Sequence, residues 1–159
     1  MSFFIPEALS AFASAGAALQ ALYQWRRRAV GNARVLIMEI EENYTFLDMV
    51  VFDEVPLNNV IQDLSVSEYK RLAGEGFDFN RLKRNRLQDD LSFEGTQMSH
   101  WAGKSTAELI DSIYEKLTDL MIRYPHNFNN PKYRWNVRVQ NIIKLTWLLL
   151  KHVGSDCSN

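Results

Sequence analysis

A regular spacing of apolar residues between Ser105 and Gly154 constrains the fold of this chain more than any other feature. Two segments of this stretch, 105–124 and 131–153, repeat apolar residues every three or four positions, as one buried face of an α-helix requires. A short segment rich in Pro and Asn, residues 125–130, separates them. The pattern predicts a helical hairpin.

Both predicted helices of the hairpin carry residues typical of helix ends. Ser105 and Glu108 have the spacing of a capping box, in which each side chain binds the backbone amide near the other residue. Pro131 suits the first turn of a helix, and Gly154 suits a helix end. We therefore expect one helix to begin directly after Ser105 and the other to begin at Pro131.

The N-terminal part of the sequence predicts one or two further long helices. Residues 3–23 are apolar and rich in Ala, and residues 32–53 repeat apolar residues at helical spacing, at Leu36, Ile40, Leu47 and Val51. Gly31 lies between the two stretches, and the sequence is compatible with one continuous helix or with two. Asn43 lies at the edge of the apolar face, where the usual role of an amide is a satisfied hydrogen bond between helices.

Shorter elements are expected in the middle of the chain. Helices are predicted over residues 57–64, 66–73 and 79–88, and an irregular surface loop over residues 89–104. Ser65 and Glu68 have the spacing of a second capping box, and Asp78 suits the cap of the third of these helices.

The fold class that these patterns predict is all-α, a single-domain helical bundle built on the C-terminal hairpin and on one or two long N-terminal helices. A chain of 159 residues is long enough to bury a core without a disulfide or a structural metal. We expect residues 1–159 to form one domain, with the Ala-rich helix of residues 1–30 at its periphery and residues 155–159 as a flexible tail.

Composition predicts an ordered protein in a reducing compartment. Apolar residues make up 47% and charged residues 23% of the chain, close to the average of soluble proteins. Cys157 is the only cysteine, which excludes an intramolecular disulfide and a thiolate cluster for a metal. We therefore expect a cytoplasmic protein with no cofactor and no metal.

The Ala-rich N-terminal run favours packing against another helix over insertion in a membrane. Glu7 and Gln20 interrupt it, and its positive charge follows the apolar residues, whereas a signal peptide has the charge first. Small residues at helical spacing allow a second helix to approach closely. We expect a homo-oligomer or a complex with a protein partner, with the Ala face of residues 11–21 or the apolar end of the last helix at the contact. Membrane association through residues 3–28 is the alternative.

Motifs of the common enzyme classes are missing or incomplete. Residues 103–106, Gly-Lys-Ser-Thr, resemble the end of a phosphate-binding loop, but the position that needs the first glycine holds Met98. None of the three histidines has a Glu three residues before it, the pattern of metal sites in helical bundles. The sequence therefore favours a non-catalytic protein over an enzyme.

Charge is unevenly distributed along a chain whose net charge is −1. Residues 39–64 carry seven acidic and no basic residues, whereas residues 116–153 carry seven basic residues and Asp119 as their single acid. The commonest cause is that helices of opposite charge pack side by side or face different parts of the solvent.

The end of the hairpin, residues 123–138, is where the sequence most favours ligand binding. Cations and aromatic rings alternate there, as suits a phosphate backbone with stacked bases. The candidate ligand-binding residues are Arg123, His126, Lys132, Arg134, Trp135 and Arg138. In the alternative interpretation, Asn and Pro make the turn, the rings close the bundle, and the cations stay solvated or pair with the acidic second helix, residues 32–53. We favour this structural interpretation because the whole chain lacks a basic excess.

Two functions follow from these patterns. The first is a non-catalytic α-helical protein that self-associates or binds another protein, because the first helix is rich in Ala and the last is apolar nearly all round at residues 147–150. The alternative is a module that binds an anionic ligand or a nucleic acid at the hairpin end.

Overall fold

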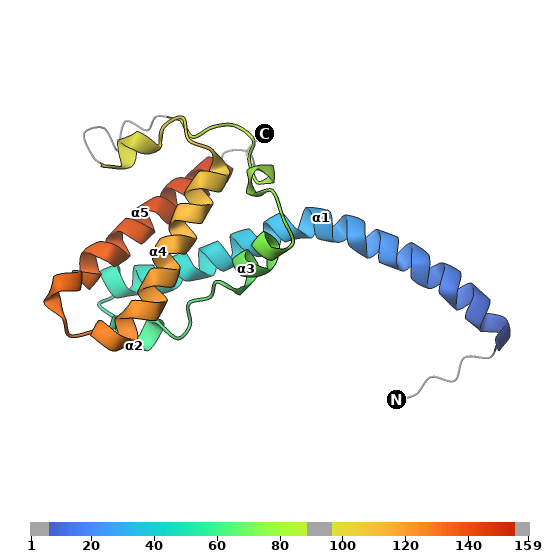
Figure 1. Ribbon diagram of the computed structural model, residues 1–159, viewed down its shortest axis with the longest axis horizontal. Coiled ribbons are helices and arrows are strands. Elements are labelled where there is room, and N and C mark those ends of the chain that lie inside the picture. Colours follow the sequence, from blue (N-terminus) through green and yellow to red (C-terminus); the bar gives the residue numbers. More distant parts are fainter. Residues whose placement is uncertain (1–6, 89–96, 155–159) are drawn as a thin grey trace. The chain divides into compact units, whose positions relative to one another are not determined.

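The computed structural model describes the backbone of residues 7–88 and 97–154. Every regular element in these ranges is a helix, which confirms the predicted all-α fold (Figure 1). The α-helices are α1 (Glu7–Phe52), α2 (Leu57–Val60), α3 (Ser67–Gly74), α4 (Thr106–Asn127) and α5 (Trp135–Gly154). Short 3-10 helices are η1 (Phe79–Arg81), η3 (Gln97–Trp101) and η4 (Pro131–Tyr133).

The chain divides into two units, Met1–Arg34 and Val35–Asn159. Helix α1 runs through the boundary as one helix of 46 residues, so Gly31 lies within a helix and does not separate two. The single domain expected for residues 1–159 stays a prediction, and the expected tail of residues 155–159 lies outside the described residues.

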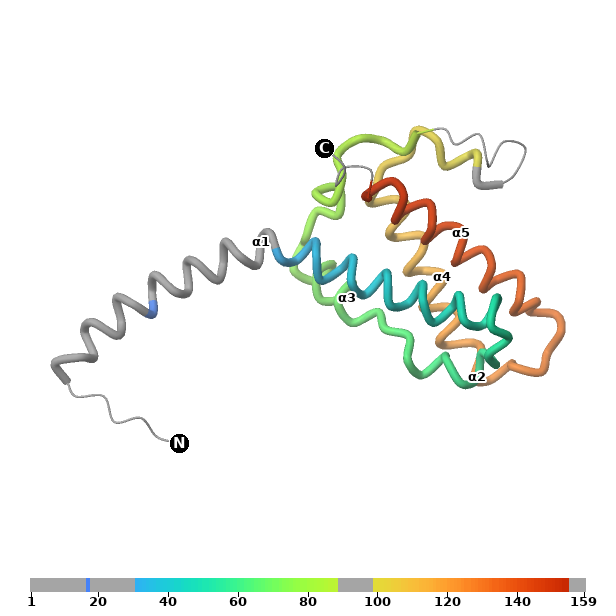
Figure 2. The backbone as a smooth tube through the Cα atoms, turned by 180° about the vertical axis from the view of Figure 1, so that it is seen from behind, coloured from blue at the N-terminus to red at the C-terminus, as the bar shows by residue number. Residues whose placement is uncertain are grey.

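The core of the second unit lies where α1, α4 and α5 meet. Figure 2 shows α4 and α5 side by side as the two arms of the predicted hairpin. Side chains of all three helices line one internal cavity of about 10 Å³, and each is at most 3% exposed: Ile40, Leu47, Ile113, Leu117 and Ile142. The apolar faces that the sequence predicted therefore pack against one another.

The N-terminus of α4 is capped as predicted. The Ser105 hydroxyl accepts a hydrogen bond from the amide of Glu108 at 3.2 Å, and the Glu108 carboxylate accepts one from the amide of Ser105 at 2.7 Å. The backbone hydrogen bond from Ser105, followed by the bond to its hydroxyl, lowers the pKa of Glu108. The capping box is therefore formed by the ionised carboxylate.

Replacing Ser105 by Ala is expected to lower the free energy of unfolding by about 1 kcal/mol, the usual contribution of an N-cap side chain. Urea denaturation measures the difference. Ser112→Ala is the matched control, because Ser112 lies inside α4, where Ala is the better helix former and no cap is lost. Equal losses in the two variants would contradict a special role of the cap.

The turn of the hairpin differs from the prediction at both ends. Helix α4 continues past Pro125 to Asn127, because side chains bind carbonyls near its end: Asn127 donates to the Arg123 carbonyl at 3.0 Å and the Trp135 indole donates to the Asn127 carbonyl at 2.9 Å. The last helix begins at Trp135 and not at Pro131. Arg134 adopts a left-handed conformation (φ 48°, ψ 58°), which ends η4 and redirects the chain into α5.

Two of the three predicted helices between α1 and α4 are shorter than expected, whereas the predicted helix 66–73 is found as α3, Ser67–Gly74. Helix α2 covers only Leu57–Val60 of the predicted range 57–64, and η1 covers only Phe79–Arg81 of the range 79–88. The Asp78 side chain nevertheless accepts the predicted capping bond, from the amide of Asn80 at 3.0 Å. Of the predicted loop 89–104, residues 89–96 lie outside the described residues.

Candidate functional site

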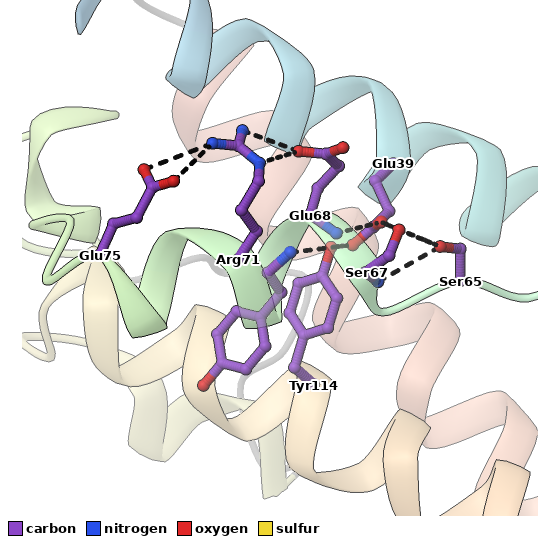
Figure 3. A network of polar contacts seen from close by, with 8 residues as sticks. Glu39, Ser65, Ser67, Glu68, Arg71, Glu75 and Tyr114 are labelled. Atoms are coloured by element: carbon purple, nitrogen blue, oxygen red, sulfur yellow. Dashed lines mark hydrogen bonds and ion pairs between the residues drawn. The ribbon is translucent and has the colours of Figure 1, made fainter. Parts of the chain in front are cut away.

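The buried carboxylate of Glu39 joins α1 to the start of α3 and to α4 (Figure 3). Glu39 is 5% exposed. One of its oxygens accepts hydrogen bonds from the hydroxyl of Ser65 at 3.0 Å and the amide of Glu68 at 2.9 Å. The other accepts bonds from the amide of Tyr69 at 3.3 Å and the hydroxyl of Tyr114 at 2.9 Å. A single charged group thus satisfies donors from two other parts of the chain.

Glu39 acts as the N-terminal cap of α3, although it lies about thirty residues earlier in the sequence. A carboxylate is favourable there because the free amides of a first helical turn carry partial positive charge. The predicted capping box of Ser65 and Glu68 is wrong. The Ser65 hydroxyl donates to Glu39, and the Glu68 carboxylate pairs with Arg71 at 2.8 Å.

Two stacked tyrosine rings lie beside this carboxylate. The rings of Tyr69 and Tyr114 are 4.2 Å apart and nearly parallel, and the Tyr69 hydroxyl donates to Asp111 at 2.8 Å. Burial, followed by the charge of Glu39, raises the pKa of Tyr114 far above its usual value. Burial, followed by the bond to Asp111, raises the pKa of Tyr69 to about 12. Both phenols therefore act as hydrogen-bond donors at neutral pH and not as bases.

Asn43 extends the same network toward the chain segment before α3. Its amide nitrogen donates to the Ser65 carbonyl at 2.7 Å, and its amide oxygen accepts from the Ser65 amide at 2.9 Å. The predicted satisfied hydrogen bond is confirmed, with a backbone segment as its partner. Among residues 31–88 and 99–154, whose side chains the structure describes, every buried side-chain N or O atom has a partner. The network around Glu39 is therefore complete without a ligand.

The hairpin end brings together three of the six candidate ligand-binding residues. Asp119 binds Arg123 through one oxygen and Arg138 through the other, the latter at 3.0 Å. Arg138 also donates to the Tyr133 carbonyl at 2.7 Å, and its guanidinium lies over the rings of Tyr133 and Trp135. Trp135 is only 9% exposed, and its ring stacks on that of Tyr133. Arg123, Trp135 and Arg138 are thus engaged in contacts that close the hairpin.

The other three candidates, His126, Lys132 and Arg134, are exposed at the same end. Their side chains make no hydrogen bond or ion pair with another residue that the structure describes. A groove of about 190 Å³ lies between α4 and α5 next to the Asp119 cluster, lined by Lys116, Asp119, Leu120, Arg138, Asn141 and Ile142. The cations that remain available to an anion at this end are therefore Lys116, Lys132 and Arg134.

A second surface of interest is the outer face of α1 in the second unit. It carries apolar side chains at helical spacing, of which Met38 is 51% and Phe52 is 71% exposed, with Val35 at 37%. A groove of about 300 Å³ on this face is lined by Met38, Glu41, Glu42, Thr45 and Phe46. We call these five residues the α1 groove. Sequence reasoning missed this surface, although residues 35–52 carry a second apolar stripe beside the one that forms the core.

The described residues hold no cluster of three or more His, Cys, Asp or Glu side chains that a metal ion would need. Across the same ranges, no helix combines the length and the apolar character needed to cross a membrane. Comparison with known proteins finds no family model, no curated protein and no solved structure that matches the chain. The function is therefore argued from the surfaces of the molecule itself.

Proposed function

We propose that this protein is a non-catalytic α-helical interaction protein that associates with a second copy of itself through the outer face of α1. The observation that carries this proposal is the exposure of Val35, Met38 and Phe52 on one face of that helix. Apolar side chains that stay exposed on one face of a helix are candidates for a contact with another protein.

Two contact surfaces were expected from the sequence. The Ala face of residues 11–21 lies, apart from Ala17, outside the residues whose side chains the structure describes, and the apolar end of α5 is largely used inside the second unit. Leu148 and Leu149 are buried in the core, and Leu150 is half-buried. Trp147 is the large apolar side chain of this end that remains exposed. The outer face of α1 therefore offers more free apolar surface to a partner.

The proposal predicts a mass near twice the 18.5 kDa of one chain in sedimentation or light scattering at micromolar concentrations. Changing Met38 and Phe52 together to Ser is expected to weaken the dimer about 10- to 100-fold, since each buried apolar side chain contributes about 1 to 2 kcal/mol. The control changes Ile122 and Phe128 to Ser, two side chains of similar exposure outside α1. The mass of one chain at every concentration would overturn self-association.

Binding of an anionic ligand or a single-stranded nucleic acid at the hairpin end is the second candidate function. Exposed cations at Lys132 and Arg134 beside the Tyr133 ring support it. Against it stand the contacts of Arg123 and Arg138 with Asp119 and the burial of Trp135. The protein interaction is therefore the first candidate.

Titration of labelled single-stranded RNA at low and at physiological salt tests this second candidate. A phosphate contact predicts binding that falls steeply with salt, because counterions are released when it forms. Changing Lys132 and Arg134 to Ala would then weaken binding at least tenfold, whereas Lys144→Ala on α5 would leave it unchanged. Undetectable binding at low salt would remove the hairpin end as a nucleic-acid site.

A further inference from the structure

We infer that the α1 groove binds the outer face of the α5 helix of a second copy, so that glutamates of one copy meet lysines of the other. This inference rests on the self-association proposed above and names the two surfaces that meet. Both surfaces lie within the second unit, Val35–Asn159. The groove combines apolar walls at Met38 and Phe46 with the carboxylates of Glu41 and Glu42.

The chemistry of the groove favours a partner that is both basic and apolar. Glu41 and Glu42 are exposed, and neither side chain forms an ion pair with a residue that the structure describes. Met38 beside them is 51% exposed. Carboxylates next to an apolar wall are complementary to a helix that presents cations beside a large apolar side chain.

The outer face of α5 has this composition. Trp147 is 37% and Val137 is 48% exposed, and the Lys151 ammonium lies over the Trp147 ring, 4.9 Å from its centroid. Lys144 lies one turn before Trp147 and Lys151 one turn after it. We call the exposed residues that follow one another on this face at spacings of three and four the α5 stripe: Val137, Gln140, Lys144, Trp147 and Lys151.

In one copy, the groove and the stripe face away from the core that their helices share. Ile40 and Leu47 of α1 and Ile142 of α5 line the same internal cavity. At about 100° per residue, Thr45 in the groove lies about 140 to 160° around α1 from Ile40 and Leu47. Lys144 lies about 160° around α5 from Ile142. The groove and the stripe therefore meet only when a second copy supplies one of them.

An antiparallel arrangement of α1 and α5 matches the two surfaces along their length. With Trp147 of one copy opposite Glu42 of the other, Val137 lies opposite Phe52, because both pairs are ten positions apart. Phe52 is 71% exposed and is the most exposed large apolar side chain among the described residues. This register thus covers apolar side chains of both copies with each other.

The same register places the two lysines of the stripe on either side of the carboxylates. Lys144 and Lys151 lie three and four positions from Trp147, which corresponds to about 4 to 6 Å along the helix axis. A lysine side chain spans this distance, so one lysine reaches Glu41 and the other Glu42. Each copy carries both surfaces, and a dimer with two-fold symmetry therefore forms this contact twice.

Charge reversal tests the pairing by sedimentation velocity on the full chain. One variant carries Glu41→Arg and Glu42→Arg, and a second carries Lys144→Glu and Lys151→Glu. Each variant alone brings like charges together and is expected to dimerise at least tenfold more weakly than the unmodified protein. An equal mixture of the two variants brings opposite charges together at both contacts, so we expect it to form the dimer again.

Two control variants reverse exposed charges outside both surfaces: Asp63→Arg with Glu115→Arg, and Lys70→Glu. We expect both to dimerise like the unmodified protein. A cooperative thermal transition of each variant shows that it is folded. A second measurement needs no variant, because screening of exposed charges is expected to weaken the unmodified dimer several-fold between about 0.05 M and about 0.5 M salt.

The outcomes separate this inference from the proposed function. If the unmodified protein has the mass of one chain at all concentrations, self-association itself is wrong. If it is a dimer and the charge-reversed variants dimerise as well as the controls, self-association stands and the pairing of the groove with the stripe is wrong. Folded variants whose mixture does not form the dimer, or a dimer of equal stability at both salt concentrations, would also overturn the pairing.

Discussion

Replacing Glu39 by Ala is expected to lower the free energy of unfolding by about 3 to 5 kcal/mol, the largest effect we expect from any surface or polar substitution in the chain. Stability is lost because the hydrogen-bond donors that now bind the Glu39 carboxylate would remain without an acceptor. The Tyr114 hydroxyl is buried, and the amides of Glu68 and Tyr69 open α3. Each buried donor without an acceptor costs about 1 to 3 kcal/mol, and water entering the space recovers part of it.

Urea denaturation at one fixed protein concentration measures this loss, because association with a second copy also changes apparent stability. Asp63→Ala, at an exposed carboxylate, is the matched control and is expected to change stability by less than about 0.5 kcal/mol. Hydrogen exchange gives an independent readout, since the amides of Glu68 and Tyr69 should exchange faster in Glu39→Ala. A variant as stable as the control, with unchanged exchange at these amides, would show that Glu39 does not cap α3.

Raising the pH from 9 to 12 is expected to destabilise the fold by about 3 kcal/mol through Tyr114 alone. Below pH 10 the phenol is protonated in the folded and the unfolded chain, so its contribution is constant. Above pH 10 the unfolded chain loses this proton while the folded protein retains it, because burial and the Glu39 charge raise the pKa of Tyr114. Stability therefore falls by about 1.4 kcal/mol per pH unit above 10. Tyr69, with a pKa of about 12, adds a smaller share because it is partly exposed.

The comparison that isolates this contribution is between the unmodified protein and Tyr114→Phe over the same pH range. The variant starts from a lower stability at pH 9, since Glu39 loses a donor, but its curve should fall by about 2 to 3 kcal/mol less. Tyr44→Phe, at a tyrosine outside the Glu39 network, should keep the slope of the unmodified protein. Parallel curves for the unmodified protein and Tyr114→Phe would contradict a raised pKa for Tyr114.

The candidate site could be predicted from the sequence only in part. The run of cations and rings at the hairpin end was visible, but the role of Asp119 was not, because Asp119 lies on α4 and Arg138 on α5. The apolar residues on the outer face of α1 were overlooked because the apolar spacing of its core face is more regular. A charged residue inside that core face, Glu39 between Leu36 and Ile40, was the one available sign of a buried polar network.

The sequence by itself determined the features whose causes lie within a few residues. The all-α fold followed from apolar residues at helical spacing, and the caps at Ser105 and Asp78 from bonds that span two or three residues. Only the tertiary structure decided the features whose partners are distant in the chain. Glu39 rather than Ser65 caps α3, and a bond from Trp135 supports the end of α4 past Pro125. A buried hydrogen-bond donor that cannot bind water binds an acceptor that packing brings close to it. The sequence alone does not reveal which acceptor that is.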